Sequence, residues 1–248
     1  MEENQIILVD KPTGISSFGV VAKVRGFLKQ EFGHKVKVGH TGTLDPFATG
    51  LLILLTGKNT KKSNEFLKLD KVYEATLKLG YISTTGDPEG EIIAYADGKK
   101  APEDTLSRSI FGDGPNTERP SPVTTGARER SEKDVSLVLK SFIGIITQTP
   151  PKFSAIKING QRAYKLARSG QDFDIPSRQV EIYSIDILSY HYPELKIRVH
   201  CSSGTYIRTL AEDIGKKLGT GAYLTALRRT KIADYDVKDA HPLTDFTH

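Results

Sequence analysis

The stretch GHTGTLDPFATG, residues 39–50, carries more information about this chain than any other segment of its length. Three glycines and one proline within twelve residues predict a loop with a fixed and unusual backbone path. The loop leads into the apolar run Leu51–Leu55, an expected buried strand, so it could hold the carboxylate of Asp45 rigidly at the mouth of a sheet. The local pattern alone favours plainer interpretations, in which Asp45 caps a turn and His40 is an ordinary hydrogen-bonded loop residue.

Hydrophobic periodicity on both sides of the loop predicts an α+β fold. Residues 71–79 alternate between apolar and polar side chains, which indicates a strand with one wet face and with Tyr73 pointing inward. The other main elements expected are strands at 6–9, 179–190 and 194–201, helices at 16–28, 131–142 and 207–218, and a short helix near Ala222. We therefore expect one domain over residues 1–248, built on a largely antiparallel mixed sheet flanked by helices and loops.

The composition fits an ordinary soluble globular protein, with 38% hydrophobic and 26% charged residues. The apolar runs are far shorter than the ~20 residues that span a bilayer, so we expect no membrane contact. The N-terminus shows no secretory signal, which makes the cytoplasm the expected compartment. The single cysteine, Cys201, excludes an internal disulfide and a multi-cysteine metal cluster, and its alternating apolar surroundings favour a buried strand position. The net charge of +5 suits a polyanionic partner.

Two segments stand apart from this pattern. Residues 97–130 are dominated by Gly, Pro, Ser, Thr and charged side chains, which predicts a mobile insertion without chemistry of its own. Beyond it, the Asn159-Gly160 turn predicts a hairpin that leads into a basic helix, together spanning about 150–175. The basic side chains of this segment are Lys152, Lys157, Arg162, Lys165 and Arg168. In isolation, they are better explained as a solvated charged face than as a functional surface.

Residues 39–50 are very similar to the catalytic motif of the TruB-family pseudouridine synthases. Further TruB-like segments occur in the family's order: VDKPTGISSF (9–18), KVYEATLKLG (71–80), TTGDPEGE (84–91), PPKFSAIKINGQRAYKLARSG (150–170), HCSSGTYIRTLAEDIGKKLG (200–219) and GAYLTALRR (221–229). Together these segments touch nearly the whole chain except the insertion at 97–130. The resemblance implies the pseudouridine synthase fold, with the hairpin at 150–175 inserted as a segment that covers the RNA.

The resemblance also implies roles for individual residues. Asp45 occupies the position of the family's catalytic aspartate, Tyr73 that of its active-site tyrosine, and Arg208 that of the arginine that pairs with the aspartate. A bidentate pair with Arg208 would hold Asp45 ionised and oriented. A carboxylate could attack ribose C1′ or the pyrimidine ring, or stabilise positive charge on the sugar, and the sequence leaves these routes open. Taken without the resemblance, Tyr73 is better explained by core packing.

Three further positions are implied to surround the reacting base. Tyr206 matches an aromatic position two residues before the arginine, Asp87 a polar position beside the uracil, and Leu227 an apolar wall. Because the target base is buried in RNA structure, it must be flipped out and received on an aromatic surface, a task that Tyr73 suits.

Other matched positions are implied to contact the rest of the RNA. His40 matches a histidine that stacks where flipped bases leave the RNA loop, and Lys61 matches a basic residue of the RNA face. Lys152, Lys157 and Arg162 belong to the insertion that closes over the T loop in the family, and a basic hairpin is physically suited to wrapping phosphates.

The activity implied is the isomerisation of uridine to pseudouridine at position 55, in the T arm of tRNA. The reaction needs neither added water nor a redox change, so we expect no cofactor and no metal. We expect tRNA as the partner, no obligatory protein partner and a monomer. Bacterial members commonly continue into a small RNA-binding domain of the PUA kind, and this chain stops at His248, so we expect the catalytic domain without an evident PUA domain.

Three alternatives stay open beside this expectation. The chain could be an RNA-binding protein that folds tRNA without needing catalysis, or a guide-dependent rRNA pseudouridine synthase of the same superfamily. It could also be a glycosidase that uses Asp45 and Asp87 as a carboxylate pair, which would release free uracil.

Overall fold

The computed structural model describes residues 2–95, 129–154, 156–158, 160–169 and 173–246. The strands are β1 (Ile6–Lys11), β2 (Val38–His40), β3 (Thr49–Thr56), β4 (Lys71–Leu79), β5 (Tyr81–Ser83), β6 (Ile92–Ala94), β7 (Gly144–Gln148), β8 (Lys157–Ile158), β9 (Gln161–Arg162), β10 (Arg178–His191), β11 (Glu194–Cys201), β12 (Ala222–Ile232), β13 (Tyr235–Asp236) and β14 (His241–Pro242). The helices are α1 (Ser17–Phe32), α2 (Ser63–Leu67), α3 (Glu132–Lys140), α4 (Ala163–Arg168) and α5 (Ile207–Leu218), with 3-10 turns η1 (Gly57–Lys62), η3 (Val237–Asp239) and η4 (Leu243–Phe246). Most of the predicted insertion, residues 97–128, lies outside the described residues.

One mixed sheet of ten strands runs through the described part of the chain. Its strand order is β14-β1-β3-β12-β4-β11-β10-β7, with β2 paired to β3 and β13 paired to β12. The pairs β1–β14 and β3–β12 are parallel, and the remaining pairs of this sheet are antiparallel. The predicted α+β class with a largely antiparallel mixed sheet is therefore confirmed.

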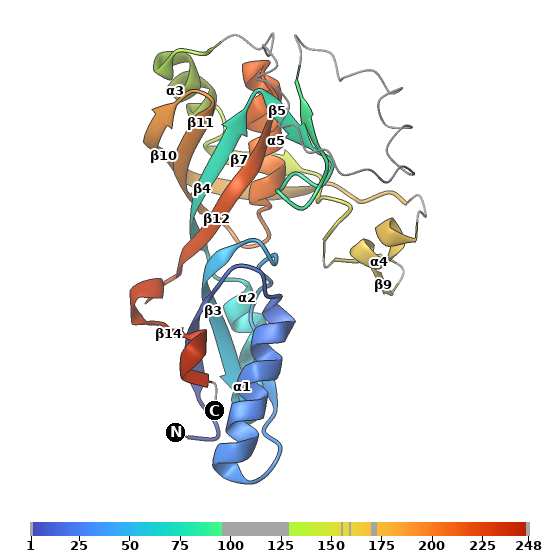
Figure 1. Cartoon of the computed structure of the whole chain (residues 1–248), viewed down its shortest axis with the longest axis vertical. Coiled ribbons are helices and arrows are strands. Elements are labelled where there is room, and N and C mark those ends of the chain that lie inside the picture. The colour runs from blue at the N-terminus through green and yellow to red at the C-terminus, as the bar shows by residue number, and fades with distance from the viewer. Residues whose placement is uncertain (1, 96–128, 155, 159, 170–172, 247–248) are drawn as a thin grey trace, which may run out of the picture.

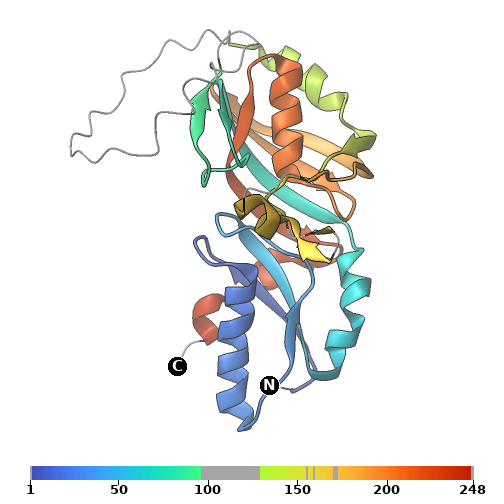
Figure 2. The same cartoon turned by 90° about the vertical axis from the view of Figure 1, so that its right-hand side faces the viewer.

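Helices cover the sheet in two separate places along its length (Figures 1 and 2). In one half, α1 buries Val24 and Leu28 in a cluster with residues of β1 and β3. In the other half, α5 buries Leu210 and Ile214 in a second cluster with residues of β4, β11 and β12. Each helix shows the apolar spacing that predicted it, since burial of that face stabilises the helix more than its intrinsic propensity does. Among the described residues, no helix is both long and apolar enough to cross a membrane.

The two halves of the sheet meet at a short parallel contact between β3 and β12. This contact consists of the pairs Thr49 with Arg228 and Gly50 with Arg229. Gly50 has φ of 102°, and a Cβ at this position would lie 2.3 Å from the carbonyl oxygen of Arg229. Only glycine allows both this backbone conformation and this close approach. The last residue of the loop at 39–50 is therefore fixed by the junction of the sheet.

The prediction of a short helix near Ala222 is wrong. Ala222, Tyr223 and Leu224 begin β12, which pairs with β4 over nearly its whole length, and all three side chains are buried. A short apolar run is compatible with either a buried helix or a buried strand, so local pattern does not decide between them. Pairing with β4 decides in favour of the strand.

Candidate active site

Two adjoining cavities lie where the loop at 39–50 faces the first turn of α5. The first has a volume of about 420 Å³ and is lined by Asp45, Tyr73 and Leu227, among others. The second has a volume of about 730 Å³ and has His40 and Asp87 in its wall. The residues that line both cavities, which we call the neck, are Thr43, Leu44, Asp45, Ser154 and Arg208.

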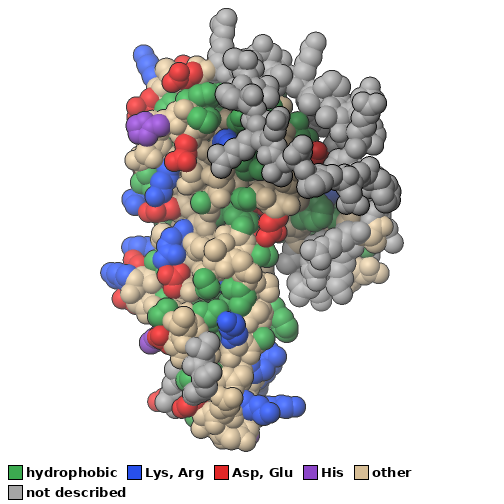
Figure 3. Space-filling model, viewed as in Figure 1, with side chains coloured by type: hydrophobic (Ala, Val, Ile, Leu, Met, Phe, Trp, Pro, Cys, Tyr) green, Lys and Arg blue, Asp and Glu red, His purple; other side chains and the backbone are tan. Residues whose placement is uncertain are grey.

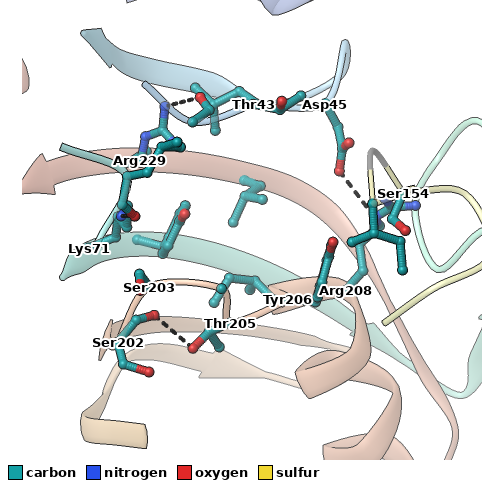
Figure 4. Close-up of a pocket in the computed structure, with 18 of the residues that line it drawn as sticks. Thr43, Asp45, Lys71, Ser154, Ser202, Ser203, Thr205, Tyr206, Arg208 and Arg229 are labelled. Carbon is teal, nitrogen blue, oxygen red and sulfur yellow. Dashed lines mark hydrogen bonds and ion pairs between the residues drawn. The ribbon is translucent and has the colours of Figure 1, made fainter. Parts of the chain in front are cut away.

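Arg208 is the central charged group of the neck (Figure 4). It stands in the first turn of α5 and is only 4% exposed. Its Nε lies 3.1 Å from Asp45 Oδ2, and its Nη1 lies 3.2 Å from Asp87 Oδ2. Nη1 also donates to the carbonyl of Thr85 and Nη2 to the carbonyl of Phe153. The predicted bidentate pair with Asp45 alone is wrong, because the guanidinium divides its donors between two carboxylates and two carbonyls.

The loop at 39–50 holds Asp45 through bonds to the start of the chain. The Ser17 hydroxyl donates to the carbonyl of Leu44 at 2.9 Å and accepts from its amide at 2.8 Å. The buried ammonium of Lys11 donates to the carbonyls of Pro12, Ile15 and Pro46. These bonds attach both neighbours of Asp45 to β1 and α1, so the carboxylate is positioned by rigid elements.

The charge on Asp45 is set by opposing effects. Burial raises the pKa of its carboxyl, Arg208 lowers it, Asp87 raises it, and Lys11 lowers it, with a net rise. Burial also lowers the pKa of Lys11 to about 8. Arg208 thus limits the rise that burial imposes on Asp45 without removing it.

Tyr73 and Leu227 form the interior of the first cavity. They lie on the adjacent strands β4 and β12, and each is 8% exposed. Burial raises the pKa of the Tyr73 hydroxyl, and Arg229 lowers it in part through its charge and a hydrogen bond. Tyr206 lines the same cavity from the residue before α5, with the guanidinium of Arg178 4.8 Å from the centre of its ring. The structure therefore brings Asp45, Tyr73, Tyr206, Arg208 and Leu227 into one cavity.

Two cations of this cavity were not identified from the sequence. Arg229 is 1% exposed, and it donates from Nε to the carbonyl of Leu51 at 2.8 Å and from Nη2 to that of Gly42 at 3.1 Å. Lys71 is 6% exposed and donates to the carbonyls of Leu67 and Leu69. The signal for Arg229 was present in the adjacent Arg228 and Arg229 of β12, because successive strand residues point to opposite faces and one of the two must point inward.

The remaining implied residues lie farther from Tyr73. Asp87 and His40 line the second cavity, on the other side of the neck. Asp87 is 4% exposed, and it accepts from the Thr85 hydroxyl at 2.6 Å as well as pairing with Arg208. Within the described part of the chain, no group of three or more His, Cys, Asp or Glu side chains could hold a metal ion.

The implied RNA-facing lysines and arginine lie outside both cavities. Lys61 is exposed in η1, and Lys152 is exposed, with its ammonium 6.0 Å from the ring centre of Phe173. The backbones of Lys157 and Arg162 form the two-residue strands β8 and β9, and their side chains lie outside the described part. On the face shown in Figure 3, basic side chains are mixed with acidic ones along one edge, so this face is not uniformly basic.

Comparisons with known proteins cover the whole site. The family described as "TruB family pseudouridylate synthase (N terminal domain)" matches residues 29–112 and 116–207. The description "tRNA pseudouridylate synthase B C-terminal domain" matches residues 208–248. The second match begins at Arg208 and includes β12, so both matched parts contribute to the sheet and to the first cavity.

Curated relatives are similar over almost the full chain. A protein of Phocaeicola vulgatus named "tRNA pseudouridine synthase B" is 41% identical over 99% of this chain and 92% of its own length. One of the same name from Nitrosospira multiformis is 43% identical over 96% of this chain and 67% of its own length.

A solved structure, "Crystal Structure of a Cbf5-Nop10-Gar1 Complex", resembles the chain with a TM-score of 0.63 and 27% identity. The likeness covers 98% of this chain and 53% of the solved one, so this chain spans about half of that protein. The family matches and the close curated relatives agree with one another and with the positions of the cavity residues. The chain therefore belongs to the TruB family of pseudouridylate synthases.

Proposed function

We propose that this chain converts one uridine in the T arm of tRNA, at position 55, to pseudouridine, with Asp45 as the catalytic carboxylate. The observation that carries the proposal is the first cavity, where Asp45, bonded to the buried Arg208, shares one space with the ring of Tyr73. The names of the relatives at 41% and 43% identity support tRNA as the substrate class.

The reaction balances without any added reagent. The bond between ribose C1′ and uracil N1 breaks, the uracil turns, and C1′ joins C5, while the proton of C5 is lost and N1 gains one. The product has the mass of the substrate. A carboxylate beside C1′ can serve such chemistry as a nucleophile or by stabilising positive charge on the sugar. Asp45 is suited to this position because Arg208 and the loop at 39–50 fix its direction.

Base flipping follows from the depth of the cavity. Tyr73 and Leu227 are nearly buried on the sheet, so a uracil can reach them only after it leaves the RNA stack. The aromatic face of Tyr73 and the apolar side chain of Leu227 would then hold the ring between them. In this arrangement the sugar lies toward the neck, where the carboxylate of Asp45 is bonded to Arg208.

The structural neighbour makes guide-dependent modification of rRNA the alternative to consider. Its title names a complex with Nop10 and Gar1, and its identity to this chain is 27% over 53% of its length. The Phocaeicola vulgatus relative is 41% identical over 92% of its length. The closer and more complete likeness to a protein named for tRNA favours tRNA.

The direct test is incubation of the full chain with an unmodified T-arm hairpin, followed by mapping of pseudouridine. We expect pseudouridine at the uridine equivalent to position 55 and no free uracil. Release of uracil would instead support a glycosidase that uses Asp45 and Asp87. A hairpin with cytidine at the target position is the matched control and should remain unchanged.

A purely RNA-folding role is tested with Asp45→Asn and Asp45→Ala under single-turnover conditions. Both changes should lower the rate by roughly a thousandfold or more, because they remove the reacting group. Asp45→Asn keeps the size of the side chain, so it should still bind the hairpin. An RNA-folding protein without catalysis would be indifferent to either change.

A further inference from the structure

Ser154 is a polar side chain of the neck that the charged network does not use. It lines both cavities and is 5% exposed. Its hydroxyl oxygen is one of the few buried side-chain polar atoms, among the described residues, that has no hydrogen-bond partner. Buried polar groups in folded proteins are nearly always paired, so an unpaired one that faces a cavity indicates a group that pairs with a ligand.

The same guanidinium that orients Asp45 also fixes the backbone next to Ser154. Arg208 Nη2 donates to the carbonyl of Phe153 at 2.7 Å, while Nε of the same group contacts Asp45. Figure 4 shows Ser154 beside Arg208, at the end of the cavity where the Asp45 carboxylate points. The position of the Ser154 hydroxyl relative to the carboxylate is therefore set by one rigid planar group.

The other polar groups of the neck already have protein partners. Each of the three guanidinium nitrogens of Arg208 contacts a protein acceptor. The carboxylate of Asp45 can only accept hydrogen bonds when it is ionised. A hydroxyl both donates and accepts, so Ser154 can pair with a substrate group that does the same.

The sugar of the target nucleotide offers such a group. This step rests on the proposed function, in which the uracil lies on Tyr73 and C1′ lies near Asp45. The carbon next to C1′ carries the 2′-hydroxyl, which both donates and accepts and which distinguishes RNA from DNA. We propose that Ser154 binds the 2′-hydroxyl of the nucleotide that is isomerised, and so contributes to the selection of a ribonucleotide at this position.

The test measures binding of two product hairpins, so that turnover does not interfere. One carries pseudouridine at the target position and the other carries 2′-deoxypseudouridine. Ser154→Ala should weaken binding of the first roughly three- to tenfold, as expected for loss of one hydrogen bond, and should leave binding of the second as in the wild type. Any effect of the deoxy sugar on RNA shape is common to both proteins and cancels in this comparison.

Ser154→Thr retains the hydroxyl and should retain part of the preference for the ribose hairpin. Ser141→Ala is the matched control, because Ser141 is exposed at the end of α3 and donates to the carbonyl of Val138. The melting temperature of Ser154→Ala should equal or exceed that of the wild type, since the change removes an unpaired buried group.

Equal weakening on both hairpins, no weakening on either, or a lower melting temperature for Ser154→Ala would each overturn the inference. Failure of the proposed function is a separate result, seen when the wild-type chain makes no pseudouridine in the uridine hairpin.

Discussion

Arg208 and Arg229 are two buried arginines at opposite ends of one cavity, and they are bonded to different partners (Figure 4). Arg208 contacts the carboxylates of Asp45 and Asp87, whereas Arg229 donates to the carbonyls of Gly42 and Leu51. One guanidinium therefore acts mainly on the charge of side chains, and the other mainly on the path of the backbone.

The difference shows how a single loop is held in two independent ways. Arg229 ties the start of the loop at 39–50 to the strand that follows it, and Arg208 holds the carboxylate of Asp45 near its centre. We expect loss of the first to loosen the loop and loss of the second to change how the carboxylate ionises. Stability, turnover rate and pH dependence should separate these two effects.

The largest effect is expected for Arg208→Met. It leaves the buried Asp87 and the partly exposed Asp45 without their cation, and removal of one partner from a buried ion pair destabilises by about 3–5 kcal/mol. The single-turnover rate should fall by roughly a hundredfold or more, because the carboxylate loses its orientation. Urea unfolding and pseudouridine formation measure the two effects. The double variant with Asp87→Asn should regain part of the stability and none of the rate, and full additivity would contradict the network.

A smaller effect is expected for Arg229→Met. Two carbonyls lose their donor, which destabilises by about 1–3 kcal/mol, and the turnover rate should fall by roughly tenfold as the loop loosens. The matched control is the adjacent Arg228→Met, because Arg228 forms a half-exposed pair with Asp10 at 2.7 Å that contributes less than about 1 kcal/mol. If both variants lost the same stability, Arg229 would have no special role in holding the loop.

Much of the fold follows from local pattern. The alternation in β4 and β11 and the apolar spacing of α5 predicted strands and a helix close to those observed, because each element buries one regular face. The start of β12 could not be predicted in this way. It is buried along a continuous apolar run, so its strand conformation depends on pairing with β4 and not on periodicity.

The site was less accessible to sequence than the fold. Asp45, Tyr73 and Arg208 were placed by resemblance, since local pattern favoured plainer interpretations for Asp45 and Tyr73 and did not decide for Arg208. Arg229 and Ser154 were missed because neither a buried arginine bonded to carbonyls nor an unpaired hydroxyl has a sequence signature. Both properties depend on which distant segments fold against the residue.

The pH dependence of turnover should shift in a direction that distinguishes the two arginines. Because the pKa of Asp45 is raised, the rate should fall with decreasing pH at a higher pH than for an ordinary aspartate. Asp87→Asn removes a negative charge that raises this pKa, so it should move the acidic limb to lower pH. Arg229→Met should leave the limb in place. A rate profile measured across the acidic range tests this, and an upward shift with Asp87→Asn would contradict the coupling.

The smallest effect expected is a gain in stability from Asp45→Asn at neutral pH. A carboxyl whose pKa is raised by folding takes up a proton more readily in the folded state, so the ionised form opposes folding at pH values above the folded-state pKa. Asparagine removes that charge. The melting temperature of the variant should therefore exceed that of the wild type near pH 7, and the difference should shrink as the pH falls through the pKa of Asp45 and the wild type becomes neutral as well. A difference that stayed constant with pH would mean that the gain comes from packing, and a loss of stability would mean that Arg208 depends on this carboxylate more than burial opposes it.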